Sequence, residues 1–193
     1  MPKLVDADAR RRDLAEATWR VIRRDGLENA SVRNVAREAG LSAGSLRHTF
    51  ATQSDLLVFA MNQVVERVEA RLAALDTDGD PVAAAERHLL GLLPLDDERR
   101  QENEVWMAFT ARSLVDPLLR ECAARNHDLL LAGCRHWVEA IAGGRVDVDT
   151  EAQRLHALID GLAVHAAIRP RITSPDRCRA LLSDHLAALA RAD

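Results

Sequence analysis

The sequence predicts an all-α protein, and three observations support this. Only nine of its 193 residues are glycine and six are proline, so few positions interrupt a helix. Aromatic residues make up 3% of the chain and tyrosine is absent, which leaves little of the material that β-strands favour. Apolar residues recur every three or four positions in the segment 9–24, the spacing of one buried helix face.

The composition excludes several classes of protein. With 48% hydrophobic and 29% charged residues, the chain is neither disordered nor fibrous. Its longest apolar runs, such as residues 129–134, are far shorter than the roughly 20 residues that span a bilayer. No apolar signal-peptide segment follows the first residue, so we expect a cytoplasmic protein. The three cysteines are odd in number and lack C-x-x-C spacing, which predicts buried thiols without disulfides or metal: Cys122, Cys134 and Cys178.

The charge is uneven along the chain. The net charge is −4, yet residues 1–50 carry ten Lys or Arg against seven Asp or Glu. Residues 51–193 carry sixteen against twenty-three. This asymmetry favours an anionic partner for the N-terminal segment, although solvated helix faces produce the same pattern.

Four helices are expected within residues 9–75. The first spans residues 9–24 and ends at an Asp-Gly pair. Ser31 and Ser42 are expected N-caps of two short helices, which extend to residues 39 and 50. The pattern Thr52-x-x-Asp55 is typical of a capping box and begins the fourth helix, which runs to about residue 75. This helix connects a domain of residues 1–52 to a second domain of residues 53–193.

About five further helices complete a predicted total of about nine. An acidic loop is expected at residues 76–80, and prolines or paired glycines separate the later segments. The expected helices span residues 81–93, 97–115, 117–142, 149–169 and 175–191.

Residues 31–50 have the signature of a helix-turn-helix motif, two short helices joined by three residues. Val35, Leu41 and Leu46 are expected to form its small core. The outward positions of the second helix are small or polar, which suits an approach to phosphates and base edges: Ala43, Gly44, Ser45, Arg47, His48 and Thr49. An ordinary helical hairpin remains the alternative interpretation.

The run from Ser31 to Phe50, followed by Ser54-Asp-Leu-Leu57, resembles the DNA-binding domain of the TetR (tetracycline repressor) family. The segment Ile159-Asp-Gly-Leu162 is similar to a pattern frequent in the BetI-like subgroup of that family. The resemblance implies a homodimer that binds operator DNA and loses affinity when a small molecule occupies the C-terminal helical bundle. We therefore predict a ligand-responsive transcriptional regulator, most simply a repressor, with activation as the other possibility.

The resemblance also implies which residues meet DNA. Residues that begin helices are expected to bond phosphates, and Arg47 is expected to make the strongest contact, to a guanine edge or a phosphate. Residues 10–12, all arginine, are expected to act as a mobile basic arm, with a solvated helix end as the alternative. The predicted DNA-binding residues are Ser31, Arg33, Ser42, Ala43, Gly44, Ser45, Arg47, His48, Thr49, Thr52 and Gln53.

In this interface the chain departs from the family pattern at three positions. Arg47 and Thr49 stand where many members carry aromatic residues that brace against the DNA backbone. Gln53 stands where a lysine is common. These departures leave open both the operator sequence and the share of affinity that charge supplies.

A ligand site is expected inside the C-terminal helices, where aromatic and polar groups fall on inner faces. Such pockets are mostly apolar with a few orienting polar groups, and tryptophan can hold a flat apolar molecule or a cation. Ordinary core packing is the alternative for each residue. The predicted ligand-binding residues are Trp106, Phe109, Cys134, Trp137 and His165.

The last two helices carry more apolar surface than a hairpin at a chain end requires. By family resemblance they pair with the same helices of a second subunit, which predicts a palindromic operator with half-sites about one DNA turn apart. The alternative is that they close the core of a single subunit. The predicted interface residues are Leu155, Ile159, Leu162, Leu182, His185 and Leu189.

Enzymatic function is not indicated. The chain contains no H-E-x-x-H, G-x-S-x-G or phosphate-loop pattern, and its seven histidines are not spaced as metal ligands. No cofactor or metal is expected. The competing prediction is a helical bundle that binds a small molecule but lacks sequence-specific DNA binding.

Overall fold

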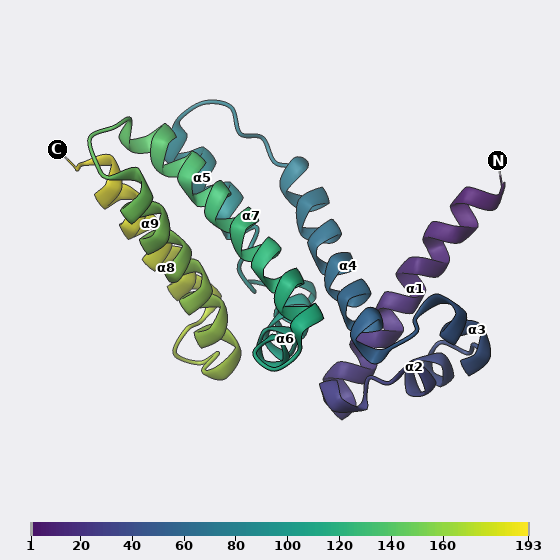
Figure 1. Cartoon of the computed structure of the whole chain (residues 1–193). Helices are drawn as coiled ribbons and strands as arrows, with labels where there is room; N and C mark the ends of the chain where they lie inside the picture. Colours follow the sequence, from purple (N-terminus) through teal and green to yellow (C-terminus); the bar gives the residue numbers. More distant parts are fainter. Residues whose placement is uncertain (1, 193) are drawn as a thin grey trace. The chain divides into compact units, whose positions relative to one another are not determined.

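The computed structural model describes residues 2–192, with side chains from Ala9 onward. This range holds nine α-helices, one short 3-10 helix and no β-strand (Figure 1), which confirms the predicted all-α class. The α-helices are α1 (Pro2–Asp25), α2 (Val32–Glu38), α3 (Ala43–Thr49), α4 (Gln53–Ala73), α5 (Pro81–Leu90), α6 (Asp97–Ser113), α7 (Pro117–Ala142), α8 (Val148–Ile168) and α9 (Pro175–Ala190), and the 3-10 helix is η1 (Leu27–Asn29).

The chain forms two compact units. The first unit contains the chain up to Arg67 together with Glu104–Ala123, and the second contains Val68–Asn103 and the chain from Ala124 onward. The first unit therefore extends beyond the residues 1–52 expected for the DNA-binding domain. Polar contacts explain the addition, because the Ser54 hydroxyl donates a 2.6 Å hydrogen bond to the Asp116 carboxylate at the start of α7.

The first unit is organised around α1. This helix begins earlier than expected, at Pro2, and α2 packs against both α1 and α3. The indole nitrogen of Trp19 donates a 3.1 Å hydrogen bond to the carbonyl oxygen of Ala60 and so ties α1 to α4. The Arg67 guanidinium lies 4.4 Å from the centre of the same indole ring and forms a cation–π contact with it.

The helix-turn-helix geometry is confirmed. Gly40 has a φ of 68°, a left-handed conformation that favours glycine, and the Leu41 N–H donates to the Ala36 carbonyl across the turn. Val35 and Leu46 are buried, as predicted for the small core, and so is Ala36. The expectation for Leu41 is wrong, because its side chain is 48% exposed. Phe50, buried and 5.1 Å from Phe59 between ring centres, belongs to the core instead.

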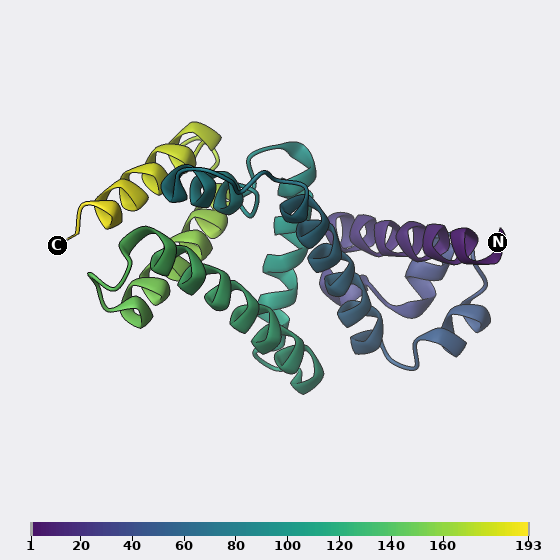
Figure 2. The ribbon, with the colours of Figure 1, turned by 90° about the horizontal axis from the view of Figure 1, so that it is seen from above.

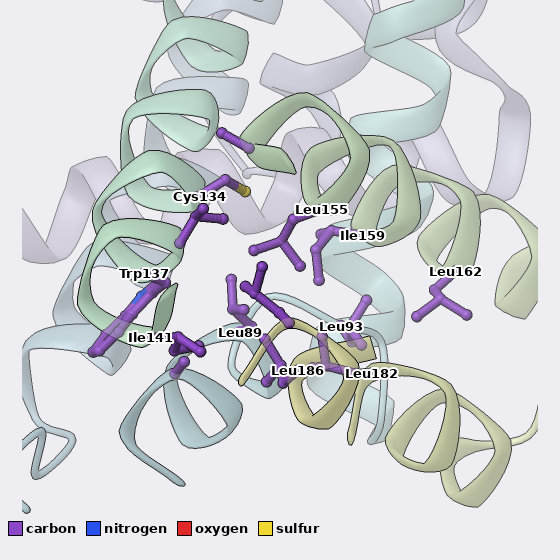
Figure 3. Close-up of a cluster of buried hydrophobic side chains, with 14 of the residues drawn as sticks. Leu89, Leu93, Cys134, Trp137, Ile141, Leu155, Ile159, Leu162, Leu182 and Leu186 are labelled. Atoms are coloured by element: carbon purple, nitrogen blue, oxygen red, sulfur yellow. The ribbon is translucent and has the colours of Figure 1, made fainter. Parts of the chain in front are cut away.

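The second unit has one continuous apolar core made by α5, α7, α8 and α9 (Figure 3). In sequence α9 comes last, and it packs against both α5 and α8 (Figures 1 and 2). Leu155, Leu182 and Leu186 are fully buried at the centre of this core. The helix starts at Asp80-Pro81 and Ser174-Pro175 are confirmed, because the Asp80 and Ser174 side chains cap α5 and α9.

Polar groups fix the helix ends within this second unit. Arg71 forms a 2.7 Å ion pair with the buried Glu102 carboxylate, and its Nε donates to the Gly91 carbonyl. The Asn103 amide donates a 2.9 Å hydrogen bond to the Ala163 carbonyl. These contacts link the end of α4 to α5 and α6, and α6 to α8. Among residues 2–192, no helix has the length and hydropathy needed to cross a membrane.

Candidate DNA interface and effector region

The second helix of the motif, α3, presents a surface of small and polar side chains. Of its seven residues only Leu46 is buried, and Ala43 is half-buried. The five other residues are exposed, as predicted: Gly44, Ser45, Arg47, His48 and Thr49. A methyl group added at Gly44 would meet no atom within 4 Å, so nothing inside this chain requires a glycine there. Such a position permits close approach of a second molecule to the helix backbone.

Ion pairing distinguishes the arginines around the motif. Arg20 and Arg24 both bond the Glu38 carboxylate at 2.9 Å, and these hydrogen bonds lower the pKa of Glu38. Arg37 bonds the side chain of a neighbouring asparagine. Arg33 and Arg47, by contrast, are exposed and make no hydrogen bond or ion pair with the described residues. These two guanidiniums are therefore available to a polyanion without first breaking an internal contact.

Two serines cap the motif's helices and retain a donor. The Ser31 hydroxyl oxygen accepts the Asn34 N–H at 3.2 Å, and Ser42 accepts the Ser45 N–H at 3.1 Å. Because each hydroxyl acts here as an acceptor, its hydrogen remains free to donate to a phosphate oxygen. Thr52 forms the predicted capping box with Asp55, in which Thr52 N–H and Asp55 Oδ2 lie 2.9 Å apart.

Two parts of the expected interface are placed differently from the simplest expectation. The Gln53 amide donates to the carbonyl oxygens of Leu27 (3.1 Å) and Glu28 (3.3 Å), so it joins α4 to η1 instead of reaching outward. The arginines at positions 10–12 lie within α1 and do not form a mobile arm, and the Arg11 guanidinium sits 5.5 Å from the Phe59 ring centre. Gln53 and Arg11 thus each contact a residue far along the chain.

In the second unit, the candidate ligand contacts lie around Trp137. Trp137 is buried in α7, and its ring centre lies 5.3 Å from that of His88 on α5 and 4.9 Å from that of His136. The Nδ1 atom of His88 is buried and has no hydrogen-bond partner among the described residues. Burial, with His136 nearby, lowers the pKa of His88 and favours its neutral form. A buried polar atom without a partner is rare in proteins, so this atom is a candidate ligand contact.

The predicted ligand-binding residues do not all share this environment. Cys134 lies in the same core as Trp137, fully buried, and burial raises the pKa of its thiol to about 12. Trp106 is half-buried and Phe109 is buried, but both belong to the first unit. The placement expected for His165 is wrong, because its side chain is exposed on α8. The buried face of that helix passes through Leu162 and Ala166, which leaves position 165 turned outward.

A polar cluster in the second unit escaped the sequence analysis. The rings of His127 and His156 lie 4.3 Å apart, and His156 Nε2 is 3.3 Å from the Asp160 carboxylate. Burial lowers the pKa of His156 and raises that of Asp160. The i,i+4 spacing of His156 and Asp160 was visible in the sequence, but the approach of His127 on α7 depends on the tertiary fold. Among the described residues, no three such side chains are arranged to hold a metal ion.

The residues expected at the dimer interface lie elsewhere. Five of them are at most 4% exposed and pack into the core of the single subunit, and His185 is half-buried with its Nε2 unpartnered. The buried five pack within one subunit and are not exposed to a second copy, while the pairing of the last two helices with a second subunit stays a prediction: Leu155, Ile159, Leu162, Leu182 and Leu189. The apolar period correctly located one face of each helix, but that face points into the subunit.

Comparison with known proteins matches two regions of the chain to one family of regulators. Residues 14–58 match the description of bacterial regulatory proteins of the tetR family, and residues 81–191 match the C-terminal region of BetI-type transcriptional repressors. The chain belongs to the TetR family. It is 40% identical over 199 aligned positions to the HTH-type transcriptional regulator PksA of Bacillus subtilis, covering 100% of this chain and 96% of that protein.

Solved structures of TetR regulators share the fold as well. A transcriptional regulator from Rhodococcus sp. Rha1 is 33% identical with a TM-score of 0.85, covering 93% of this chain and 95% of that one. A putative regulator from Saccharomonospora viridis, solved in complex with choline, is 27% identical with a TM-score of 0.72, covering 94% and 96%. TetR-family regulators pair an N-terminal DNA-binding motif with a C-terminal ligand-binding domain, and they are transcription factors, not enzymes.

Proposed function

We propose that this TetR-family protein is a homodimeric repressor that binds a palindromic operator and is released from it by a small molecule. The observation that supports this most directly is the surface of the helix-turn-helix motif. There Arg33 and Arg47 have no partner among the described residues, and Gly44 leaves the backbone of α3 open to close approach.

Selection of bound sequences from a random duplex pool tests this proposal. We expect one palindrome with half-sites about one DNA turn apart, recovered at both low and moderate salt. Recovery of no sequence above background at either salt concentration would contradict specific DNA binding and leave a small-molecule-binding bundle.

The two unpaired arginines are proposed to make different contacts with DNA. Arg33 lies in the first turn of α2 and is proposed to contact a phosphate. Arg33→Ala should weaken binding to all sequences alike and reduce the slope of log affinity against log salt by about 1. Arg20→Ala is the matched control, because Arg20 is held by Glu38 and should change the slope much less. Equal slopes for both variants would show that internal pairing does not select the DNA-contacting arginines.

The dimer surface is proposed to lie on the outer face of α8. Ala157, Gly161, Val164 and Ile168 recur at helical spacing on this face, and the Ile168 side chain is 63% exposed. A methyl group added at Gly161 would meet no atom within 4 Å. Because glycine within a helix costs about 0.5–1 kcal/mol relative to alanine, close approach of a second helix is a sufficient reason for it.

Substitution of the helical glycines tests this surface. Gly161→Arg should convert a dimer to a monomer in sedimentation velocity, with the helical content unchanged by circular dichroism. Gly133→Arg on α7 is the matched control, since Gly133 also faces open space in the subunit. Dissociation by the control substitution alone would move the interface to α7.

The effector is proposed to be an organic cation that lies against Trp137. An indole face attracts quaternary ammonium groups, and the unpartnered Nδ1 of His88 can accept a hydrogen bond from a hydroxyl of the same molecule. The choline-bound relative supports this chemistry.

Choline and its uncharged isostere 3,3-dimethyl-1-butanol provide the test. Choline should raise the unfolding midpoint and release operator DNA, whereas the isostere should do neither. Trp137→Leu should abolish the choline effect, while Leu129→Ala, at an exposed site, should keep it. Equal responses to the two compounds would show that positive charge is not recognised.

A further inference from the structure

The side chains of α3 restrict which bases the protein can read. The helix contains Ala43, Gly44, Ser45, Leu46, Arg47, His48 and Thr49, and thus neither a carboxamide nor a carboxylate. In the major groove, asparagine and glutamine read adenine by paired hydrogen bonds, and carboxylates accept from the cytosine amino group. Neither kind of readout is available on this helix.

Neighbouring residues do not supply the missing groups. The Asn34 amide donates to the Asn29 carbonyl at 2.9 Å, and Gln53 is bound to η1. Glu38 is held by two arginines, and Asp55 is used in the capping box with Thr52. Every carboxamide and carboxylate of α2, α3 and the first turn of α4 is therefore engaged within the protein.

Arg47 is the one cationic side chain of α3 that presents several donors. It lies in the last turn of the helix, exposed and without a partner among the described residues, three residues after the glycine that lets the backbone approach DNA. A guanidinium matches the O6 and N7 acceptors of guanine with two parallel hydrogen bonds. The adjacent His48 adds a single ring donor, which also suits a purine acceptor.

We infer that each operator half-site contains a guanine read by Arg47, and that adenine is not selected by paired hydrogen bonds anywhere in the half-site. This inference rests on the proposed DNA-binding function and makes it more specific. Readout by paired hydrogen bonds then depends on guanine acceptors, and the other positions contribute through single contacts, phosphate contacts and DNA shape.

Replacement of single guanines by 7-deazaguanine tests the inference on the selected operator. This base keeps its Watson–Crick pairing but lacks the N7 acceptor. One such replacement per half-site should weaken binding of the unaltered protein several-fold and leave Arg47→Ala unaffected. Arg47→Ala itself should lose about 10- to 100-fold in affinity and accept any base at that position.

The alternatives give different results. If Arg47 contacts only phosphate, Arg47→Ala weakens all sequences equally and 7-deazaguanine has no effect at any position, which overturns the inference while operator binding stands. If no operator is recovered at all, the proposed function fails first. Arg47→Lys, which keeps the charge but not the paired geometry, should retain the salt dependence and lose the guanine preference.

Discussion

The two units of the molecule place their chemistry in opposite locations. In the first unit the candidate functional groups are exposed on two helices of seven residues. Of these helices, α2 buries three side chains and α3 buries one. In the second unit most candidate groups are withdrawn from solvent: Trp137 and His156 are buried and His88 is half-buried. An exposed interface for DNA must keep its arginines free of internal partners, whereas a ligand region must keep polar atoms inside an apolar core. The comparison predicts that stability and DNA recognition can be altered separately.

Removing bulk from the core of the second unit should give the largest effect. Leu182 is fully buried, and Leu182→Ala should lower the free energy of unfolding by about 2–5 kcal/mol, as measured by urea denaturation. Leu129→Ala, at a site 58% exposed, should change it by no more than about 0.5 kcal/mol. Similar losses for both variants would contradict the described core.

Acidification should destabilise the second unit before the first. Burial lowers the pKa of His88, His156 and His185, all in the second unit. Each has a lower pKa folded than unfolded, so the unfolded state binds more protons as pH falls. Their contribution to stability is therefore present above the unfolded value of about 6.5 and is lost below it.

Thermal unfolding between pH 7.5 and 5.5 measures this loss. The midpoint of the transition monitored through Trp137, in a chain with the other tryptophans replaced, should fall with pH. His88→Gln should flatten the dependence. A midpoint that rises on acidification would reverse the assigned direction of the pKa shifts.

A smaller effect on stability is expected from the hydrogen bond between Ser54 and Asp116, which links α4 to the residue before α7. The Ser54 hydroxyl, with the Leu118 and Leu119 N–H groups, lowers the pKa of Asp116. Ser54→Ala and Asp116→Asn should show a coupling energy of about 1 kcal/mol in a double-mutant cycle near neutral pH. This coupling should be lost as pH falls toward the lowered pKa of Asp116. Additive losses at every pH would show that the bond contributes nothing to the unit.

The smallest effect is expected from thiol reagents. Cys122, Cys134 and Cys178 are all buried, and burial raises the pKa of Cys134 and Cys178. Iodoacetamide at pH 7.5 should modify the native protein far more slowly than the protein in urea, as counted by mass spectrometry. Rapid labelling of one thiol without loss of operator binding would show that its helix opens locally.

The helix boundaries and the DNA-binding motif followed closely from the sequence. Caps at Ser31, Ser42, Asp80 and Ser174 are local signals, because each side chain bonds a backbone N–H three residues away or nearer. Some predictions failed because a distant partner decided the outcome. The Gln53 amide donates to carbonyl oxygens more than twenty residues earlier in the chain, and no local pattern indicates such a contact.

The sequence by itself determined the all-α class, the helix-turn-helix and the exposed character of α3, since these depend on spacing and capping within a few residues. The tertiary structure alone decided which apolar face of α8 turns inward, which arginines remain unpaired and which polar groups meet in the second unit. The periodicity of an amphipathic helix identifies a buried face but not its partner. For Leu155, Ile159 and Leu162 that partner is the core of the same subunit, not a second copy.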